Sequence, residues 1–536
     1  MLLDKVIGGY LDHLFEGWEP WMISLASSCA TVILIISYNF LFQDESLFLR
    51  AKKFVLRNAR RIPAVRNKIS QEFDVSKKRM ENELMAPTRN LGSIRALPQS
   101  RSAEEVLALA KKYKETESAD WSKLSGAIYS GSDEITKLST SIYPMFAWSN
   151  PLHPDVFPSV RHMESEVVRM CCTMFNGDEK TCGSMTSGGT ESIFMACKAY
   201  RDYALARGIK KPVMVVPVTA HAAFEKSADY LCMGVRKIPM DSTTCQVNLR
   251  AMKKAIDGRT CMLVGSAPHF PHGIIDQIGE ISALGLKYKI PVHVDSCLGG
   301  FLIPFMEKAG YPLELFDFRL EGVTSISADT HKYGYAPKGS SVILYRNHTY
   351  LHHQYSVTPD WPGGIYASPT MSGSRVGASI ASAWSVMLYM GEDGYVKATK
   401  ETIETTRKIK EALKKMKNIY ILGDPLVSVI AVGSKDFNVY LLSDAMSARG
   451  WHLNALQFPS SIHVCITKRH TKPGVAEKFL QELQECITNI MENPPKEDTG
   501  MAAIYGLAQS IPDRTIISEM AWAYLDSCVA LPGSGS

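Results

Sequence analysis

The sequence predicts an α/β fold built on a mostly parallel sheet. From about residue 129 onward, short apolar runs rich in β-branched residues alternate with helical patterns, which is typical of parallel strands joined by helices. The predicted strands cover residues 213–218, 262–265, 292–295 and 341–344, and helices are predicted at 192–207 and 276–289. Because ligands bind beyond the carboxyl ends of parallel strands, the polar residues that follow these strands are the candidates for function.

The composition is that of an ordinary globular protein. A formal net charge of +5 over 536 residues is too small to indicate nucleic-acid binding, and the sequence has no zinc or nucleic-acid motif. The 12 cysteines lie mostly within apolar runs and lack the spacing of a metal site. We therefore expect buried free thiols in a reducing compartment and no metal centre.

The amino terminus departs from this composition. Residues 21–42 carry no charged side chain, and 22 helical residues at about 1.5 Å each span about 33 Å, enough to cross a membrane. We predict one transmembrane helix there, since aromatic residues gather at both ends as interface anchors do. A buried core helix is the alternative. A cleaved signal peptide is disfavoured, because the leading segment is acidic and has no basic start.

Basic residues follow the predicted span, from Arg50 to Lys68. The positive-inside rule then places residues 1–20 outside the cytosol and the rest of the chain within it. The same basic run is able to contact anionic lipid headgroups, although a stop-transfer flank explains it without lipid binding. Hydropathy alone does not identify the membrane.

The remaining chain divides into four predicted regions. Helices and a linker occupy residues 43–128, the main α/β domain follows at 129–372, and a smaller α/β domain covers 373–493. Within the smaller domain the predicted elements are a charged helix near 397–416, a strand near 426–432 and a late helix near 476–491. A weakly patterned tail covers 494–536, and its Gly-Ser end is expected to be disordered.

The polar loop at residues 327–341 is the feature around which the chain is organised. A strand-like run at 322–326 enters it and another strand leaves it, so that Lys332 is displayed at the end of a sheet, where a Schiff-base lysine would sit. The lysine amine must lose a proton before it can attack a carbonyl, and His331 and Lys338 offer a neighbourhood that lowers its pKa. The alternative is that Lys332 and Lys338 are solvated loop lysines.

Gly188, Gly189 and Thr190 precede an apolar helical run. Two glycines allow a tight turn that exposes backbone amides, and the start of the helix adds partial positive charge, so that the segment suits a phosphate group. It is neither a Walker A loop nor a GxGxxG fingerprint. A turn that only caps the helix is the alternative.

Asp295 ends one apolar strand, and His221 follows another. A carboxylate in this position can hold a heteroaromatic ring nitrogen protonated, because a nearby opposite charge favours the charged form. The histidine lies where a flat ring could be stacked. The alternatives are an acid that caps the turn at 298–300 and an ordinary loop histidine.

The order of these motifs is more specific than any one of them. Together they resemble the fold-type-I pyridoxal 5′-phosphate enzymes, in the branch of the group II amino-acid decarboxylases. The segments that look most like the sphingosine-1-phosphate lyase family are FAWSNPLHPD at 146–155, TSGGTES at 186–192, HVD at 293–295 and SADTHKYGYAPKGS at 327–340. The resemblance spans nearly the whole chain. It implies a large domain with a mostly parallel seven-stranded sheet and a smaller carboxyl-terminal α/β domain, preceded by one amino-terminal transmembrane helix.

The resemblance also implies roles for individual residues. Lys332 is implied to form the Schiff base with pyridoxal 5′-phosphate, Asp295 to pair with the pyridine nitrogen and His221 to stack on the ring. The residues implied to bind the cofactor phosphate are Gly188, Gly189, Thr190 and His331, with Gly373 and Ser374 of the partner subunit in a homodimer. The residues implied to form the substrate pocket are Tyr129, Asn150, His153 and Lys338, of which the last two would meet the lipid phosphate. One departure is Ser296, where alanine is expected. Its hydroxyl should alter the contacts with the ring only slightly.

The implied reaction is a retro-aldol cleavage of the C2–C3 bond of a phosphorylated sphingoid base such as sphingosine 1-phosphate. It yields a long-chain fatty aldehyde and phosphoethanolamine. Tyr129 and Lys332 are the candidates for proton transfer, and the sequence does not assign the base. The predicted anchor suits a lipid substrate, and the resemblance implies the endoplasmic reticulum membrane, with a luminal amino terminus and a cytosolic catalytic domain.

Two other functions would use the same residues. An amino-acid decarboxylase would share the cofactor apparatus, but it leaves the predicted membrane span unexplained. A catalytically inactive membrane scaffold is disfavoured by the presence of Lys332, Asp295 and His221. Product analysis separates the lyase from the decarboxylase, because one releases an aldehyde and the other carbon dioxide. For the scaffold, an absorbance band of the Schiff base that is lost in Lys332→Ala decides.

Overall fold

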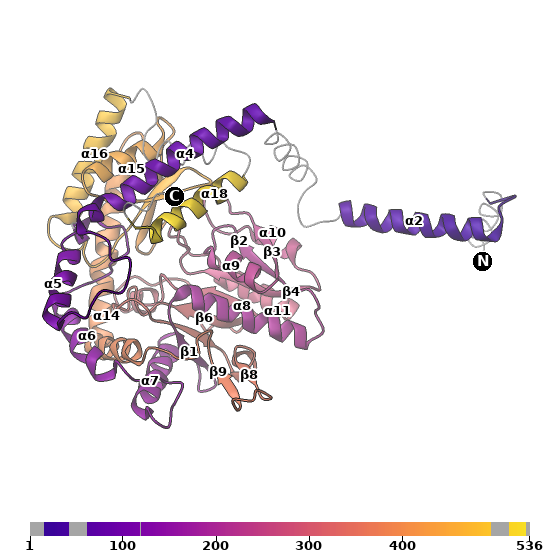
Figure 1. The fold of residues 1–536 in the computed structure, drawn as a ribbon, viewed down its shortest axis with the longest axis horizontal. Helices are drawn as coiled ribbons and strands as arrows, with labels where there is room; N and C mark the ends of the chain where they lie inside the picture. The colour runs from indigo at the N-terminus through magenta and orange to yellow at the C-terminus, as the bar shows by residue number, and fades with distance from the viewer. Residues whose placement is uncertain (1–14, 42–61, 118, 495–513, 532–536) are drawn as a thin grey trace. The chain divides into compact units, whose positions relative to one another are not determined.

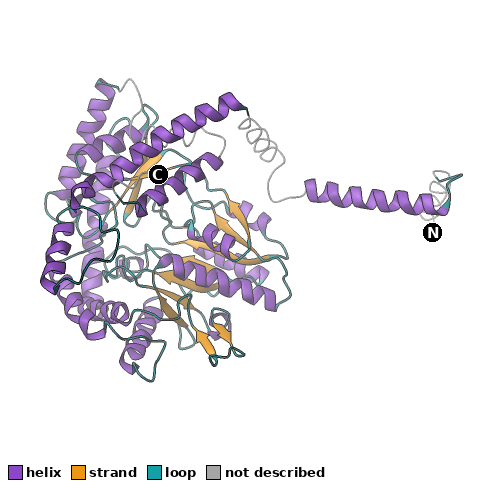
Figure 2. Cartoon of the chain, in the orientation of Figure 1, coloured by secondary structure: helices purple, strands orange, loops and turns teal. Residues whose placement is uncertain are grey.

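The computed structural model describes residues 15–41, 62–117, 119–494 and 514–531 (Figures 1 and 2). These residues form two compact units. One unit holds the described residues up to 117 together with 514–531, and the other holds residues 119–494. Both of the larger sheets and every predicted site residue lie in the second unit.

The second unit contains a seven-stranded sheet with the order β1-β7-β6-β5-β4-β2-β3. Its strands are β1 Cys182–Thr186, β2 Val213–Pro217, β3 Gly234–Ile238, β4 Thr260–Ser266, β5 Val292–Asp295, β6 Val323–Ala328 and β7 Ser341–Tyr345. Strands β2 to β6 pair in parallel, whereas β7 is antiparallel to both of its neighbours, β1 and β6. The prediction of a mostly parallel seven-stranded sheet is confirmed.

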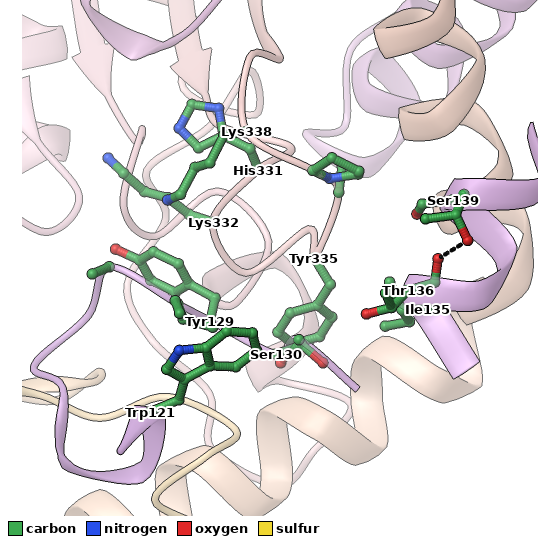
Figure 3. A pocket seen from close by; sticks show the side chains of 16 residues that line it. Trp121, Tyr129, Ser130, Ile135, Thr136, Ser139, His331, Lys332, Tyr335 and Lys338 are labelled. Atoms are coloured by element: carbon green, nitrogen blue, oxygen red, sulfur yellow. Dashed lines mark hydrogen bonds between the residues drawn. The ribbon is translucent and has the colours of Figure 1, made fainter. Parts of the chain in front are cut away.

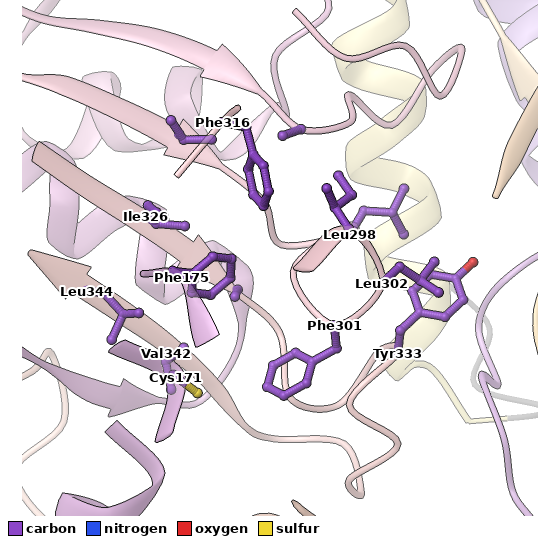
Figure 4. Packing of buried hydrophobic residues seen from close by; sticks show 14 of the residues in the cluster. Cys171, Phe175, Leu298, Phe301, Leu302, Phe316, Ile326, Tyr333, Val342 and Leu344 are labelled. Atoms are coloured by element: carbon purple, nitrogen blue, oxygen red, sulfur yellow. The ribbon is translucent and has the colours of Figure 1, made fainter. Parts of the chain in front are cut away.

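This sheet is buried on both faces. Val215 and Leu344 face one hydrophobic cluster, and Met214 and Ile343, next to them in the chain, face the other. Figure 4 shows part of the first cluster. The helices on the first face are α7 Pro158–Met174, α11 Ile278–Tyr288 and α14 Gly377–Leu413, and those on the second are α8 Gly189–Ala206 and α9 Ala223–Tyr230. Burial on both faces explains why the strands read as continuous apolar runs.

A four-stranded antiparallel sheet follows, with the order β10-β11-β13-β12. Its elements are β10 Tyr420–Ile421, β11 Val429–Gly433, α15 Val439–Ala448, β12 Asn454–Leu456, β13 Ser461–Cys465 and α16 Val475–Glu492. The strand predicted near 426–432 corresponds to β11 and the late helix to α16. The predicted charged helix at 397–416 is the second part of α14, which is interrupted at Gly391, where φ is 55°.

Shorter elements complete the second unit. They are η2 Trp121–Lys123, α6 Asp133–Phe146, α10 Leu249–Ala255, α12 Ile303–Met306, α13 His348–Leu351 and the hairpin of β8 Ser356–Thr358 with β9 Tyr366–Ser368. Helix α6 packs against α14. It therefore belongs to the wall of the main domain, although it precedes β1 in the chain.

Every cysteine lies in the part of the chain that the structure describes. All 12 are free thiols, as predicted, and eight of them are buried. Burial raises the pKa of these buried thiols, for example that of Cys465 to about 11. They therefore act as small apolar side chains.

The first unit is helical. Its elements are α2 Pro20–Leu41, α4 Pro63–Met85, η1 Ala86–Leu91, α5 Ala103–Lys114 and α18 Arg514–Val529. Helix α5 begins with a capping box, in which Ser102 Oγ accepts a hydrogen bond from the Glu105 N–H (3.2 Å) and the Glu105 carboxylate accepts one from the Ser102 N–H (2.7 Å). Helix α18 packs against α4. Helix α18 lies within residues 494–536, which the sequence pattern predicts only as a tail, so this helix was not predicted.

Helix α2 coincides with the span predicted at residues 21–42, so the prediction of a helix there is confirmed. Among the residues that the structure describes, no helix is long and apolar enough to cross a membrane. Most of the basic run at 50–68 and the Gly-Ser end predicted to be disordered lie outside the described residues.

Candidate active site

The predicted motifs meet at one edge of the seven-stranded sheet. Strands β4, β5 and β6 are parallel, so their carboxyl ends share an edge, and the loop after β6 carries the predicted Schiff-base lysine. A cavity of about 350 Å³ lies there. The predicted cofactor residues that line it are Gly188, Gly189, Thr190, His221, His331 and Lys332, and Cys297 and Asp329 line it with them.

The Gly-Gly-Thr turn joins the end of β1 to the start of α8. The first turn of that helix, whose amides have no partner within the helix, therefore borders the cavity. Glu191 fixes the turn, since its Oε2 accepts hydrogen bonds from the Ser187 N–H (2.7 Å) and hydroxyl (2.6 Å). A Cβ on Gly189 would lie 2.8 Å from both carboxylate oxygens of Asp329, so a side chain there requires a shift. This geometry suits an anion such as a phosphate.

Lys332 forms an ion pair with a carboxylate that the sequence analysis did not single out. Its Nζ lies 2.9 Å from Oδ2 of Asp329, and His331 Nε2 lies 3.7 Å from the same oxygen. Burial alone would lower the pKa of the Lys332 amine, but the Asp329 carboxylate raises it above the ordinary lysine value. The expectation that His331 and Lys338 lower this pKa is therefore wrong, because a closer opposite charge outweighs them.

Asp295 is buried at the end of β5 and does not itself line this cavity, although Cys297, two residues later, does. Its Oδ1 accepts hydrogen bonds from the Cys297 N–H (3.1 Å) and the Ser327 hydroxyl (3.4 Å). The carboxylate thus caps the turn after β5 through this oxygen, as the alternative interpretation held. Ser327 also contacts His293, whose Nε2 lies 3.2 Å from the hydroxyl oxygen. Burial lowers the pKa of His293 to about 4, so this ring is neutral at neutral pH.

The departure at Ser296 has a structural explanation. Its side chain is fully buried and donates a hydrogen bond to the Ala267 carbonyl oxygen at 2.9 Å. The hydroxyl is therefore satisfied by the backbone that follows β4. This contact agrees with the expectation that a hydroxyl at this position perturbs the site little.

A second cavity, of about 380 Å³, adjoins Lys332 and holds Tyr129 and Lys338 (Figure 3). His331 and Lys332 line both cavities. Lys338 Nζ lies 5.2 Å from the centre of the Tyr129 ring, which is a cation–π distance. Figure 3 shows Tyr129 and Lys332 on one side of the pocket and Ile135, on helix α6, on the other. A pocket with cations at one end and aromatic, aliphatic and hydroxyl side chains elsewhere can accept a phosphorylated amphiphile.

Tyr129 is held in place by the second sheet. Its ring packs edge-on against Tyr333 at 4.8 Å, and the Tyr333 hydroxyl donates to the Ile466 carbonyl oxygen at 2.5 Å. The loop before Tyr129 binds β13, because the Cys465 N–H donates to the Ser125 hydroxyl at 2.9 Å. Burial raises the pKa of the Tyr129 phenol, which therefore keeps its proton at neutral pH. This contribution of β13 is not predictable from the sequence, because its residues lie more than 300 positions away.

The other predicted site residues lie apart from these two cavities. Asn150 Nδ2 donates to Ser374 Oγ at 3.1 Å, and Ser374 lines a smaller cavity of about 110 Å³. Gly373 lies against Tyr366 and lines neither large cavity, and His153 is exposed and lines neither. Within one subunit, the structure does not bring these four residues to Lys332.

Comparisons with known proteins agree with this architecture. The family described as "Pyridoxal-dependent decarboxylase conserved domain" matches residues 139–433. Sphingosine-1-phosphate lyase 1 of Rattus norvegicus is 51% identical over 97% of this chain and 92% of its own length. The sphingosine-1-phosphate lyase of Drosophila melanogaster is 46% identical over 97% of this chain and 96% of its own length.

Solved structures give the same picture. The sphingosine-1-phosphate lyase of Burkholderia pseudomallei matches with a TM-score of 0.74 and 38% identity, covering 80% of this chain and 98% of its own. A glutamate decarboxylase of Lactobacillus brevis, 20% identical, matches with a TM-score of 0.66 over 78% of this chain and 99% of its own. At that identity the second match shows the fold alone.

Proposed function

The chain belongs to the sphingosine-1-phosphate lyase family, and from this premise we propose how its own residues carry out the reaction. The protein is a pyridoxal 5′-phosphate-dependent lyase that cleaves phosphorylated sphingoid bases such as sphingosine 1-phosphate. The C2–C3 bond breaks in a retro-aldol step, and the products are a long-chain fatty aldehyde and phosphoethanolamine. The observation that carries this conclusion is the 51% identity over 97% of the chain with a lyase of this name.

The residues of the 350 Å³ cavity fit the cofactor. Gly188, Gly189 and Thr190, at the start of α8, would hold its phosphate together with His331, and Asp295 would pair with its ring nitrogen. His221 borders the same cavity, where it would stack on the ring. When bound, the cofactor supplies an electron-accepting ring that stabilises the charge left on C2. The fit rests on a helix start, a histidine ring and a lysine amine that line one cavity, with the Asp295 carboxylate buried at the end of β5, two residues before Cys297 of the same lining.

The neighbouring cavity would take the substrate. Lys338 offers a cation for the lipid phosphate, and the apolar residues beside it would exclude water from the reacting bond. We propose that Asn150 and His153 complete this pocket only in the assembled enzyme, since neither lines it within one subunit.

Tyr129 and Lys332 are the proposed proton carriers. Both line the 380 Å³ cavity, with the phenol of Tyr129 buried beside the cation of Lys338. The raised pKa of Tyr129 keeps its proton in place at neutral pH, so the phenol can donate a hydrogen bond to a substrate oxygen.

Product analysis tests the function directly. Purified protein is incubated with pyridoxal 5′-phosphate and a phosphorylated sphingoid base, and long-chain aldehyde and phosphoethanolamine are measured. Lys332→Ala should remain folded and form neither product. Aldehyde formation by Lys332→Ala at the wild-type rate would refute the assignment of this lysine, and carbon dioxide release from an amino acid without aldehyde would favour a decarboxylase.

The active enzyme is proposed to be a homodimer in which Gly373 and Ser374 of the partner subunit reach the cofactor phosphate. The loop at 371–376 carries exposed apolar side chains, Met371 (55%) and Val376 (54%), and the Gly377 N–H bonds the Ser149 carbonyl next to Trp148, which is 91% exposed. Exposed apolar groups gathered in one place are typical of a protein interface.

A mixing experiment tests the shared site. Lys332→Ala and Ser374→Trp are each expected to be inactive alone. Co-expressed, they should restore about a quarter of the wild-type activity, because a mixed dimer then holds one intact site. A monomeric active enzyme, or no recovery in proven mixed dimers, would contradict the shared site.

Residues 21–42 are proposed to anchor the enzyme in the endoplasmic reticulum membrane, with a luminal amino terminus and a cytosolic catalytic domain. The proposal is supported by the absence of charged residues in this segment and by the basic run that follows it. A glycosylation acceptor added before residue 15 should be modified, whereas one added after residue 494 should not. Extraction of the full chain by carbonate would contradict a membrane-spanning anchor.

A further inference from the structure

Asp329 is a buried carboxylate, only 2% exposed, whose charged partners both belong to the reactive loop. Its Oδ2 lies 2.9 Å from Lys332 Nζ and 3.7 Å from His331 Nε2. Its Oδ1 is buried and has no hydrogen-bond partner within 3.5 Å among the described residues, and the Ser341 hydroxyl is the uncharged group that helps to lower the pKa of this carboxyl. Carboxylates that serve stability alone are normally satisfied through both oxygens, because an unpaired buried oxygen costs free energy. Both charged partners of Asp329 thus lie on the loop that carries the predicted Schiff-base lysine.

The surrounding residues preserve this pair. Gly189 packs against Asp329 so closely that a Cβ would lie 2.8 Å from both carboxylate oxygens. Burial would raise the pKa of Asp329, but the Lys332 charge lowers it below the ordinary value. Because the same interaction raises the pKa of Lys332, both members of the pair are charged at neutral pH.

Other titratable groups near the amine do not supply this charge. Those that act on Lys332 or its loop are Cys297, Tyr129, His331 and Lys338. Burial raises the pKa of Cys297 and of Tyr129, so both are uncharged at neutral pH. Burial lowers the pKa of His331 and that of Lys338, and neither can become an anion. Of these five groups, Asp329 alone is a carboxylate. The other carboxylate that lines the cavity, Glu191, accepts hydrogen bonds from the Ser187 N–H and hydroxyl, whereas Asp329 lies 2.9 Å from the amine.

We propose that Asp329 is a positioning residue that keeps the Lys332 amine charged and at the cavity wall whenever this amine is free during turnover, so that Lys332 serves as a proton donor. The inference rests on the lyase function stated above. The sequence left open whether Lys332 gives a proton to C2 or takes the proton of the C3 hydroxyl. The inference assigns Lys332 the first role and excludes the second.

The proton balance is consistent with this role. When the C2–C3 bond breaks, its electron pair stays with C2, and C3 keeps its oxygen as the aldehyde after the hydroxyl proton has left to a base. The Lys332 ammonium then gives one proton to C2. This transfer leaves Lys332 as a neutral amine, the nucleophilic form that would be able to take the place of the product's amine on the bound cofactor. Asp329 thus keeps the amine charged until its proton has been used.

The test compares variants that remove the charge with variants that keep it. Asp329→Asn and Asp329→Ser remove the carboxylate, and Asp329→Glu retains it. Asp317→Asn is the matched control, since Asp317 is 1% exposed and pairs with Arg319 at 2.9 Å outside both cavities. Each full-length protein is stripped of cofactor, and the rate at which it recaptures pyridoxal 5′-phosphate is followed by absorbance from pH 6 to pH 11.

The midpoint of this pH profile is the diagnostic quantity. Removing a negative charge beside the phosphate site should speed the capture of pyridoxal 5′-phosphate at every pH. Only a change in the Lys332 pKa should move the pH at which the capture rate is half of its maximum. Asp329→Asn and Asp329→Ser should lower the midpoint by about 1 to 3 pH units. Asp329→Glu and Asp317→Asn should stay near the wild-type midpoint.

The holoenzymes give a second readout. Assayed at least one pH unit above their lowered midpoint, the charge-removing variants should lose at least tenfold in kcat relative to wild type, with a smaller change in KM, because most of the free amine has then lost the proton that it would donate. An unchanged midpoint in either folded charge-removing variant would overturn the role of Asp329. If wild-type enzyme forms no aldehyde, the proposed function itself fails, so the two failures are distinguishable.

Discussion

Because Gly189 has no side chain, it leaves room both for a phosphate at the start of α8 and for the Asp329 carboxylate. Its amide lies in the first turn of α8, at the predicted phosphate site, and the space beside it holds the Asp329 carboxylate and the Cys297 thiol, each 2.8 Å from where a Cβ would be. The sequence analysis attributed this glycine to backbone turning and amide exposure alone. The structure adds that the residue makes room for the ion pair of Lys332.

Gly189→Ala should therefore weaken cofactor binding by at least tenfold and lower the free energy of unfolding by about 1 to 3 kcal/mol, because an added methyl group must displace buried atoms. Cofactor titration by absorbance and thermal melting measure the two effects. Gly188→Ala is the matched comparison, since its Cβ would lie 3.4 Å from His331 Cε1, an ordinary contact. Equal losses in the two variants would contradict the steric explanation.

Asp295 allows a separate test of the buried carboxylate. Asp295→Ala should lose far more activity than Asp295→Glu, since only the second keeps a negative charge for the ring nitrogen. Steady-state kinetics with saturating cofactor makes the comparison. If the two variants lose equally, the carboxylate serves only as the cap of the turn at Cys297.

Residue roles were predictable from sequence where one motif contains them. The Gly-Gly-Thr turn, His221 and Lys332 were placed in advance at the ends of strands, and they do line one cavity. Asp329 lies in the loop at 327–341, but the sequence assigned it no role. Its carboxylate reaches the Lys332 amine only because the chain turns between these two residues, and the sequence does not show that turn. Ser125 was missed because its partner belongs to a distant strand.

Among the elements, the loop after β4 and strand β13 share a group of buried histidines. His269 and His272 lie in the loop with their rings 5.3 Å apart, and His463 Nδ1 on β13 lies 2.8 Å from the Pro271 carbonyl oxygen. Burial lowers the pKa of His269 to about 3 and those of His272 and His463 to about 4. These rings are therefore neutral in the folded protein.

This cluster predicts acid sensitivity. The unfolded chain binds protons at these residues below about pH 6.5, whereas the folded protein does so only near pH 4. Stability is therefore fully present above pH 6.5 and is lost progressively as the pH falls toward 4. Thermal melts should show a decreasing Tm across this window, and His463→Asn should reduce the slope. A Tm independent of pH from 6.5 to 4.5 would contradict the neutral cluster.

Element predictions succeeded where the apolar pattern was strong. The strands β2, β4, β5 and β7 lie close to the apolar runs that predicted them, because a sheet buried on both faces requires such runs. The reversed direction of β7 could not be predicted, since pairing direction leaves no trace in composition. The first part of α14, rich in Ala, Ser and Gly, and helix α18 were missed because their patterns are weak.

For the whole molecule, the division into two units separates the predicted anchor from the catalytic machinery. Both larger sheets, both cavities around Lys332 and every predicted site residue belong to residues 119–494 of the described chain. Helix α2 belongs to the other unit. None of the predicted site residues therefore lies in α2.

Deleting residues 1–43 should accordingly give a soluble enzyme with kcat within about threefold of the full chain when the substrate is dispersed in detergent, because every residue at the cavities remains. Activity assays and size-exclusion chromatography check the result. An insoluble or inactive truncated protein would indicate that the apolar segment packs into the body of the enzyme.

The central claim is that the Lys332 amine bonds covalently to pyridoxal 5′-phosphate in the active enzyme. Its most direct test is mass spectrometry of the cofactor-loaded enzyme after borohydride reduction and proteolysis. The account predicts one phosphopyridoxyl adduct per chain, on the peptide that contains Lys332. An unmodified Lys332 peptide from fully active enzyme, or an adduct on another lysine, would contradict it.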